Sequence, residues 1–483
     1  MDFDEKTNGV LQEFLKIAEI PRPSHHEERI GAYLVDWARA NGLAVTQDEL
    51  GDVIMEKPAS SGAEAAPRVI LQAHMDMVCV AAEGVVYNPL TDPIKVVNDG
   101  RALRAEGTSL GADDGIGIAL CQQLLKDDSL RHGPMRVIVT VNEEDGMDSI
   151  GLSPQYLDGG FLINLDWESL GSLCNSAAGC DFAEIRREAS MERLPAGWTA
   201  LAVTLKGLQG GHSGVGINLG RANALVCMAT FLSRLMEKGV PLRLVSFCGG
   251  QAKNAIPASA QAVIAFPDEQ RSAVSEAFDA YKKDFADAFG PIEGTAELFC
   301  QDCEPVADAL DQASARALLE LLAALPNGVN TMSPFAQGLV ESSQNLGTLT
   351  AADGQIRLEI MARSCVAYRA EELLRASRLL AERFGFTYTQ GDHAPAWAVR
   401  PGSRLVPIAC EAYRELTGRE MVVEPVHGGL ECGAFYEKNP RLDMIAIGPT
   451  LTDVHSPDET CDIESVSTTY QLLVRILHKL ACL

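Results

Sequence analysis

The segment VILQAHMD, residues 69–76, is a short apolar run that ends in a histidine and an aspartate. Three further runs have the same form: MRVIVTVNEED (135–145), FLINLD (161–166) and MIAIG (444–448), the last followed closely by TDVHSPDE (452–459). Continuous apolar runs are typical of parallel strands, which are buried on both faces of their sheet. Ligands of open parallel sheets bind beyond the carboxyl ends of the strands. The four runs therefore predict a mainly parallel sheet with titratable side chains along one edge.

The pattern around these runs predicts how the chain is divided. Helices are expected at Asn8–Glu19, from a capping box of Ser24 and Glu27 to about Ala40, and at Gly115–Lys126. From residue 181 the strands mix polar and apolar residues, as strands with one wet face do. The last ninety or so residues return to the first pattern. We therefore expect an α/β domain made of residues 1–180 and 391–483, interrupted by an inserted α+β domain at 181–390.

The composition excludes several classes of protein. The chain has 483 residues, 47% hydrophobic and 22% charged, which is ordinary for a globular protein. Its 40 basic and 66 acidic residues give a net charge of −26, which disfavours binding to nucleic acid or to an anionic membrane. Its acidic first residues do not fit a signal peptide, and no apolar run is long enough to span a membrane. The 13 cysteines, an odd number, argue against a disulfide framework. We expect a cytoplasmic protein.

The side chains at the strand ends suit metal binding. Taken singly, a His-x-Asp after a strand is usually a surface turn, and an Asp-Asp pair among glycines, as in GTSLGADDGIG (107–117), is usually a helix cap. Four strand ends that each deliver a histidine or an acid are hard to explain that way. Imidazole and carboxylate ligands suit Zn²⁺, Mn²⁺ or Co²⁺. Two ions about 3.5–4 Å apart need a bridging carboxylate and further ligands on each side.

The motifs, taken in order, resemble those of the co-catalytic di-zinc metallopeptidases, the family of carboxypeptidase G, aminoacylase and the succinyl-diaminopimelate desuccinylases. Within it the chain most resembles the aminoacyl-histidine dipeptidases, also called cytosolic nonspecific dipeptidases. The matching stretches are PRPSHHEE, LQAHMDMV, GTSLGADDGIGIA, NEEDGMDS, LINLD, GLQGGHSG, KNAIP, GLECG and IGPTLTDVHSPDE. They run from residue 21 to residue 459, so the resemblance covers nearly the whole chain.

The resemblance implies a role for each residue of the expected centre. His74 and Asp166 would bind one zinc, Glu144 and His455 the other, and Asp113 would bridge them, with Mn or Co as possible replacements. A hydroxide bridging the metals would attack the peptide carbonyl, with Glu143 as general base. Asp76 would orient His74. The resemblance also implies a cis peptide between Asp113 and Asp114, and a lid and dimerisation role for the inserted domain.

Four further residues have implied roles with open alternatives. His212 would stabilise the oxyanion in the partner subunit of a homodimer, or would only shape its glycine loop. Asn254 and Arg363 would hold the substrate carboxylate, although Arg363 could instead form a salt bridge at the end of a strand. Glu431 could bind the free α-amino group of a dipeptide.

The resemblance implies an enzyme that hydrolyses dipeptides, both Xaa-His and broader Xaa-Xaa. An N-acyl amino acid amidohydrolase or a tripeptidase of the same mechanism is the alternative. A non-catalytic relative is a further alternative, but it would lack a ligand or the base, and all of these positions are filled.

Overall fold

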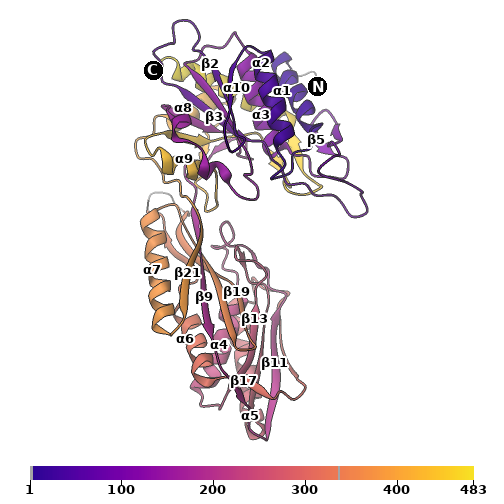
Figure 1. Cartoon of the computed structure of the whole chain (residues 1–483), viewed down its shortest axis with the longest axis vertical. Helices are drawn as coiled ribbons and strands as arrows, with labels where there is room; N and C mark the ends of the chain where they lie inside the picture. The colour runs from indigo at the N-terminus through magenta and orange to yellow at the C-terminus, as the bar shows by residue number, and fades with distance from the viewer. Residues whose placement is uncertain (1–3, 335–337) are drawn as a thin grey trace. The chain divides into compact units, whose positions relative to one another are not determined.

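The computed structural model describes residues 4–334 and 338–483, which fold into two compact units (Figure 1). The first unit comprises Met1–Ala177, Pro395–Pro425 and Leu430–Leu483, and the second comprises Ala178–Ala394 and Val426–Gly429. The predicted insertion at 181–390 lies within the second unit. That unit also contains residues 426–429, which the sequence analysis places in the first domain.

The first unit is built on a six-stranded sheet. Its strand order is β1 (Ala44–Gln47), β2 (Val53–Lys57), β6 (Met135–Thr140), β3 (Val69–His74), β7 (Phe161–Asn164) and β23 (Asp443–Ala446). The last four strands are parallel to one another, whereas β2 is antiparallel to β6, and β1 to β2. The predicted α/β class is therefore confirmed, with an antiparallel edge at β1 and β2.

Both faces of this sheet are covered, which explains the continuous apolar runs. Val69, Leu71 and Ala73 pack into a core with helices α1 (Glu5–Ala18), α2 (Glu28–Ala40), α3 (Ala112–Lys126), α8 (Leu405–Thr417) and α10 (Ile463–Leu480). Ile70 alternates to the opposite face and is also fully buried. Gln72, on that same face, contacts Glu431, the residue that precedes helix α9 (Cys432–Lys438).

Short elements complete the first unit. Strands β24 (Leu451–Thr452), β25 (Thr460–Asp462), β5 (Ala102–Ala105) and β4 (Val96–Asn98) form a small sheet, and β22 (Val422–Val423) pairs with β8 (Ser172–Leu173). Two 3₁₀ turns, η1 and η2, lie at Asp148–Gly151 and Pro154–Leu157.

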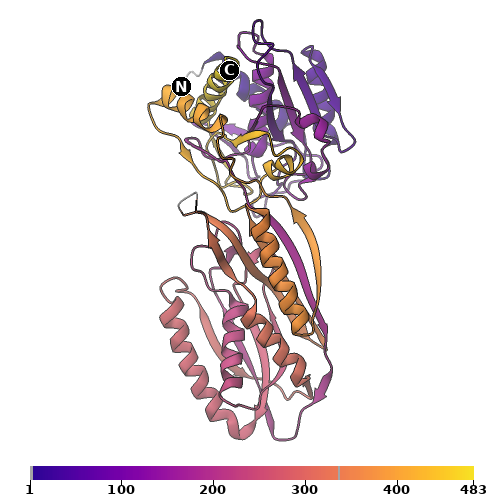
Figure 2. The same cartoon turned by 90° about the vertical axis from the view of Figure 1, so that its left-hand side faces the viewer.

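The second unit is a nine-stranded antiparallel sheet. Its main order is β16 (Glu297–Asp302), β11 (Trp198–Lys206), β15 (Ala260–Pro267), β13 (Arg243–Gly249), β19 (Val340–Ala352), β20 (Gln355–Ser364), β9 (Gly179–Glu188) and β21 (Thr387–Ala394), and β18 (Gly328–Met332) pairs with β19. Helices α4 (Ala224–Glu237), α5 (Arg271–Phe289), α6 (Gln312–Ala324) and α7 (Ala367–Arg383) form a layer on one face (Figure 2). Smaller pairs are β10 (Met191–Arg193) with β17 (Asp308–Leu310) and β12 (Gly211–His212) with β14 (Ala255–Ile256); η3 spans Asp268–Gln270.

One local prediction is wrong. Ser24 and Glu27 do not form a capping box, because helix α2 begins at Glu28 without a side-chain cap. Ser24 Oγ instead donates to Asp76 Oδ2 at 2.8 Å, and Glu27 Oε1 accepts from the backbone of His25 and Asn142. Both side chains are thus used to hold loops at the carboxyl edge of the sheet.

Among the helices of residues 4–334 and 338–483, none is both long and apolar enough to cross a membrane.

Candidate metal centre

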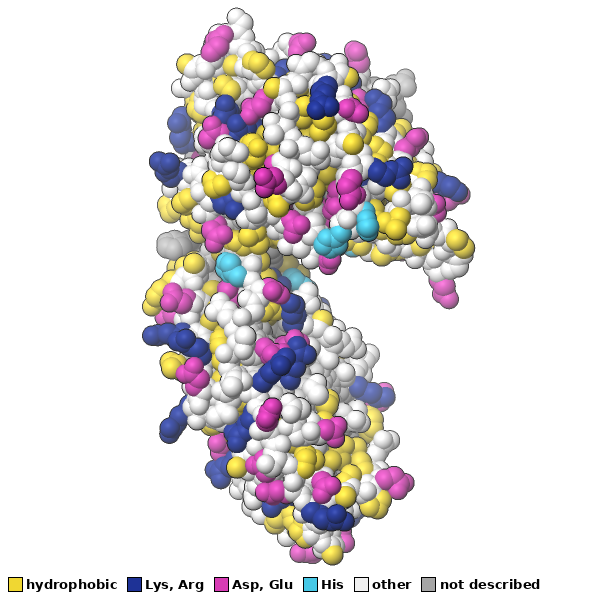
Figure 3. Space-filling model, in the orientation of Figure 1, with side chains coloured by type: hydrophobic (Ala, Val, Ile, Leu, Met, Phe, Trp, Pro, Cys, Tyr) yellow, Lys and Arg dark blue, Asp and Glu magenta, His cyan; other side chains and the backbone are white. Residues whose placement is uncertain are grey.

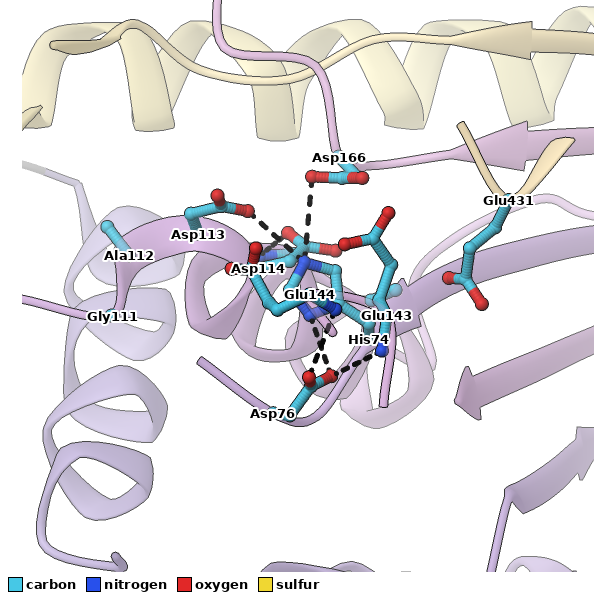
Figure 4. Close-up of polar contacts among 12 residues, drawn as sticks. His74, Asp76, Gly111, Ala112, Asp113, Asp114, Glu143, Glu144, Asp166 and Glu431 are labelled. Atoms are coloured by element: carbon cyan, nitrogen blue, oxygen red, sulfur yellow. Dashed lines mark hydrogen bonds and ion pairs between the residues drawn. The ribbon is translucent and has the colours of Figure 1, made fainter. Parts of the chain in front are cut away.

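Five side chains from separate segments meet at the carboxyl edge of the first unit's sheet. Figure 4 shows four of them, those of His74, Asp113, Glu144 and Asp166. His74 ends β3, Glu144 follows β6, Asp166 follows β7, His455 lies beyond β23, and Asp113 is in the first turn of α3. Their ligand atoms form two groups, His74 with Asp113 and Asp166, and Asp113 with Glu144 and His455, and within each group they lie within 4.8 Å of one another. Asp113 belongs to both groups.

The two oxygens of Asp113 face the two histidines. Oδ1 is 3.2 Å from His74 Nε2, and Oδ2 is 3.0 Å from His455 Nε2. His74 Nε2 is also 3.7 Å from Asp166 Oδ1, and His455 Nε2 is 2.9 Å from Glu144 Oε2. The Asp113–Asp114 peptide is cis, as predicted. A carboxylate that divides its oxygens in this way suits a ligand shared between two cations.

Asp76 ties two of the ligand-bearing segments together. Its Oδ1 lies 3.3 Å from His74 Nδ1, on the side of the ring opposite the cluster. The same carboxylate accepts the backbone N–H groups of Glu143 at 3.0 Å and Glu144 at 3.2 Å. Asp76 is fully buried, so these donors and the imidazole stabilise its charge. Asp76 therefore both orients the His74 imidazole and holds the turn after β6 that carries Glu143 and Glu144.

The turn after β6 has two more buried carboxylate anchors. Asp52 Oδ1 accepts the N–H of Val141 at 2.9 Å, and Glu27 Oε1 accepts that of Asn142 at 3.1 Å. Asn142 adopts φ 51°, in the left-handed region that asparagine tolerates better than most residues. Four consecutive N–H groups, from residue 141 to 144, are thus bound by carboxylates.

Glu459 performs the same task for the loop that carries Asp113. Its carboxylate accepts the backbone N–H groups of Leu110, Gly111, Ala112 and Asp113 at 2.7, 3.0, 2.8 and 3.4 Å. Sequence reasoning assigned Glu459 no role, although it closes the IGPTLTDVHSPDE motif. The signal was its spacing, four residues after His455.

Arg22 is a second residue whose role was missed. It is 1% exposed, and its guanidinium donates to the carbonyl oxygens of Met75 at 2.9 Å, Asp76 at 2.7 Å and Gly111. It thereby links the loop after β3 to the loop before α3. Its position in PRPSHHEE offered the only sequence clue.

Glu143 lies inside the cluster beside Glu431 (Figure 4). Burial raises the pKa of Glu143 to about 8, and the negative charges of Glu431, Glu144 and Asp113 act in the same direction. Glu431 is itself fully buried, and its Oε2 accepts from Gln72 Nε2 at 2.5 Å and Thr140 Oγ1 at 2.8 Å. Glu143 belongs to neither ligand group.

The remaining candidates lie in the second unit. His212 ends β12, where it pairs with Ala255, Asn254 directly precedes β14, and Ser213 N–H donates to the Asn254 carbonyl at 2.9 Å. Arg363 Nη2 donates to His212 Nε2 at 3.1 Å. Burial and the positive charge of Arg363 lower the pKa of His212 and favour a neutral ring. The structure thus groups His212, Asn254 and Arg363 with one another.

The residues of the first unit fit two divalent cations. Two imidazole–carboxylate groups that share one carboxylate, with an unshared glutamate beside them, define the kind of site used by two-metal hydrolases. The chain belongs to peptidase family M20/M25/M40, whose profile matches residues 70–479. It is therefore an enzyme of a metal-dependent peptidase family.

Individual relatives agree with this assignment. The chain is 36% identical to the cytosol non-specific dipeptidase of Escherichia coli over 469 residues, covering 97% of this chain and 96% of that protein. Its structure is similar to that of the aminoacylhistidine dipeptidase from Vibrio alginolyticus, with a TM-score of 0.92, 34% identity and coverage of 99% and 98%. A Staphylococcus aureus tripeptidase, 17% identical with a TM-score of 0.55 and 99% coverage of both chains, shares the fold.

The contacts of Glu459 lead to a testable expectation. A Glu459→Gln variant places an amide N–H₂ against backbone donors and leaves one oxygen for four N–H groups. We expect its metal affinity to fall about 10–100-fold, because a displaced Asp113 loop misplaces the shared carboxylate. Metal titration of chelator-treated protein measures this. Glu464→Gln, an exposed change at the start of α10, is the control. Equal affinity in both variants would contradict the assigned role.

Proposed function

We propose that the protein is a dipeptidase that cleaves Xaa-His and broader Xaa-Xaa dipeptides. The observation that carries the proposal is the placement of Asp113 between two imidazole groups, with Glu143 beside them and in neither ligand group. The names of the relatives from Escherichia coli and Vibrio alginolyticus, both dipeptidases, support the substrate class.

We propose that His74 and Asp166 hold one divalent cation, that Glu144 and His455 hold a second, and that Asp113 is shared. Two zinc ions are the expected occupants, and Mn²⁺ or Co²⁺ suits the same donors. Cations bound there polarise the scissile carbonyl and make water more acidic.

Glu143 is the proposed general base. Its carboxylate takes a proton from the attacking water and then delivers it to the leaving amine. Burial raises the pKa of Glu143, and cations bound beside it would lower that pKa and favour the carboxylate that accepts the proton. Asp76 assists by fixing the His74 ring and the Glu143 backbone.

The two ends of the substrate have separate proposed partners. The guanidinium of Arg363, with Asn254, would bind the substrate carboxylate, for which a planar two-pronged donor is suited. Glu431 would supply negative charge for the α-amino group. Its position next to Glu143 supports this role. Because Glu431 is fully buried, its charge would act on the amino group through the field at the site and not by direct contact at the surface.

We further propose that the enzyme is a cytoplasmic homodimer in which the second unit acts as lid and dimerisation domain and His212 serves the partner's site. His212 is exposed, lies in the two-residue strand β12 and has glycines close by on both sides in the sequence. This position supports its reach toward another chain. Acidic and basic side chains are interspersed on the face drawn in Figure 3, which offers nucleic acid no continuous basic patch there.

Two adjacent acids should behave differently on mutation. Glu143→Gln keeps the shape of the side chain and removes the base, so turnover should fall about 10²–10⁴-fold while metal content is retained. Glu144→Gln should instead lower metal affinity. Metal analysis and dipeptide hydrolysis on the same preparations measure both effects. The same phenotype in both variants would overturn the division of roles.

The role of Glu431 can be separated from that of Glu143 by the choice of substrate. Glu431→Gln should lower kcat/KM for Ala-Ala and Gly-His by about tenfold or more, the value of one charged contact, and should leave hydrolysis of an N-acetyl amino acid unaffected. Parallel assays on the metal-loaded protein provide the comparison. An equal loss on both substrates would mean that Glu431 only supports Glu143. Faster hydrolysis of the acetyl amino acid by the unmodified enzyme would favour the amidohydrolase alternative.

Action of His212 across the subunit boundary can be tested by mixing inactive subunits. His212→Ala and Glu143→Gln chains, each inactive alone, should form hybrid dimers with one complete site and regain activity. The control pairs His212→Ala with a chain that carries both changes, where no complete site exists. Confirmed hybrids without recovered activity would leave His212 acting within its own chain or shaping its loop.

A further inference from the structure

A pocket of the first unit lies at the opposite edge of the sheet from the candidate metal centre. It has a volume of about 220 Å³ and is lined in part by Phe161 and Asp443, the first residues of β7 and β23, which are paired with each other. At about 3.3 Å per residue, the five steps from Phe161 to Asp166 separate the two edges by about 16 Å. The pocket is therefore distinct from the site described above.

Three arginines line this pocket: Arg400, Arg404 and Arg441. Arg400 is held in place, because its Nη1 donates to the carbonyl oxygens of Pro440 at 3.2 Å and Arg441 at 2.9 Å. Within residues 4–334 and 338–483, the side chains of Arg404 and Arg441 have no hydrogen bond or ion pair. Arg404 and Arg441 are exposed, so two guanidinium groups border the pocket with donors open to solvent and to a ligand.

The carboxylate in the pocket does not neutralise these arginines. Asp443 is buried and accepts from Ser403 Oγ at 2.7 Å and from the N–H groups of Arg404 at 2.7 Å and Leu405 at 3.1 Å. Its charge is directed at the start of α8, which begins at Leu405. The pocket therefore keeps a local excess of positive charge on a chain whose net charge is −26.

We propose that this pocket binds a small molecule carrying a phosphate group. A guanidinium presents paired N–H donors that match the oxygens of phosphate, and two free guanidiniums can engage one dianion from two sides. The pocket is smaller than the roughly 300–1,000 Å³ that hold drug-sized ligands, so the ligand is small. Phe161 and Pro67 supply an apolar wall for a carbon portion next to the phosphate.

Inorganic phosphate, titrated calorimetrically into the metal-loaded full-length protein, tests the proposal. Phosphate also binds metal ions, so the measurement is the difference between the unmodified protein and an Arg404→Gln/Arg441→Gln variant, whose metal centre is unchanged. We expect one class of phosphate site to weaken at least about tenfold in the variant. Arg419→Gln, which removes an exposed arginine just beyond the far end of α8, is the matched control and should bind as the unmodified protein does.

Two further measurements test the ligand class and the contribution of a single arginine. Succinate should bind this site at least about tenfold more weakly than phosphate, because its carboxylates carry less charge per group. Arg441→Gln alone should give an intermediate loss and serves if the double variant does not fold, as judged by its melting temperature without phosphate. Identical phosphate binding by unmodified and Gln-substituted proteins would overturn the proposal. Equal affinity for succinate would overturn the phosphate assignment.

Discussion

Buried carboxylates that accept backbone N–H groups hold the metal-centre loops in place. Asp52, Glu27 and Asp76 bind the N–H groups of residues 141–144, and Glu459 binds those of residues 110–113. Burial raises the pKa of Asp52 to about 8 and raises those of Glu27 and Glu459, whereas His74 and the N–H of Glu143 help to keep the pKa of Asp76 low. These bonds restrict the two loops that carry Asp113, Glu143 and Glu144.

The five ligand side chains comprise three carboxylic acids and two imidazoles, which shift one another's pKa values. The excess of acids over imidazoles favours bound cations. Burial alone would raise the pKa of Asp113, but the imidazoles of His455 and His74 lower it overall. Asp166 has less help: burial and the charge of Asp113 raise its pKa well above the ordinary value. The hydrogen bonds of Asp113 and Glu144 raise the pKa of His455 to about 10. Protons thus offset part of the negative charge, and divalent cations in their place would allow every ligand to ionise.

The sequence predicted the sheet well because apolar runs and strand-end acids are local signals. It failed where a residue serves a distant loop. Ser24 and Glu27 have the spacing of a capping box, yet their partners are Asp76 and Asn142, far along the chain. Strand β19 has no apolar signal in its first half, because it carries Glu341, Ser342, Ser343, Gln344 and Asn345 in succession, all buried and all polar. Such a segment becomes a central strand only when neighbouring strands and side chains satisfy its polar groups.

The first unit is assembled from three separate stretches of chain. Its sheet acquires β23 only at Asp443–Ala446, and its core includes α10, which ends at Leu480. During synthesis from the amino end, residues 178–394 leave the ribosome before those elements exist. The second unit can therefore gain most of its structure while β7 still lacks its outer neighbour β23. The unit that contains the first strands is therefore completed after the inserted one, and the outer edge of β7 stays unpaired until β23 has been synthesised.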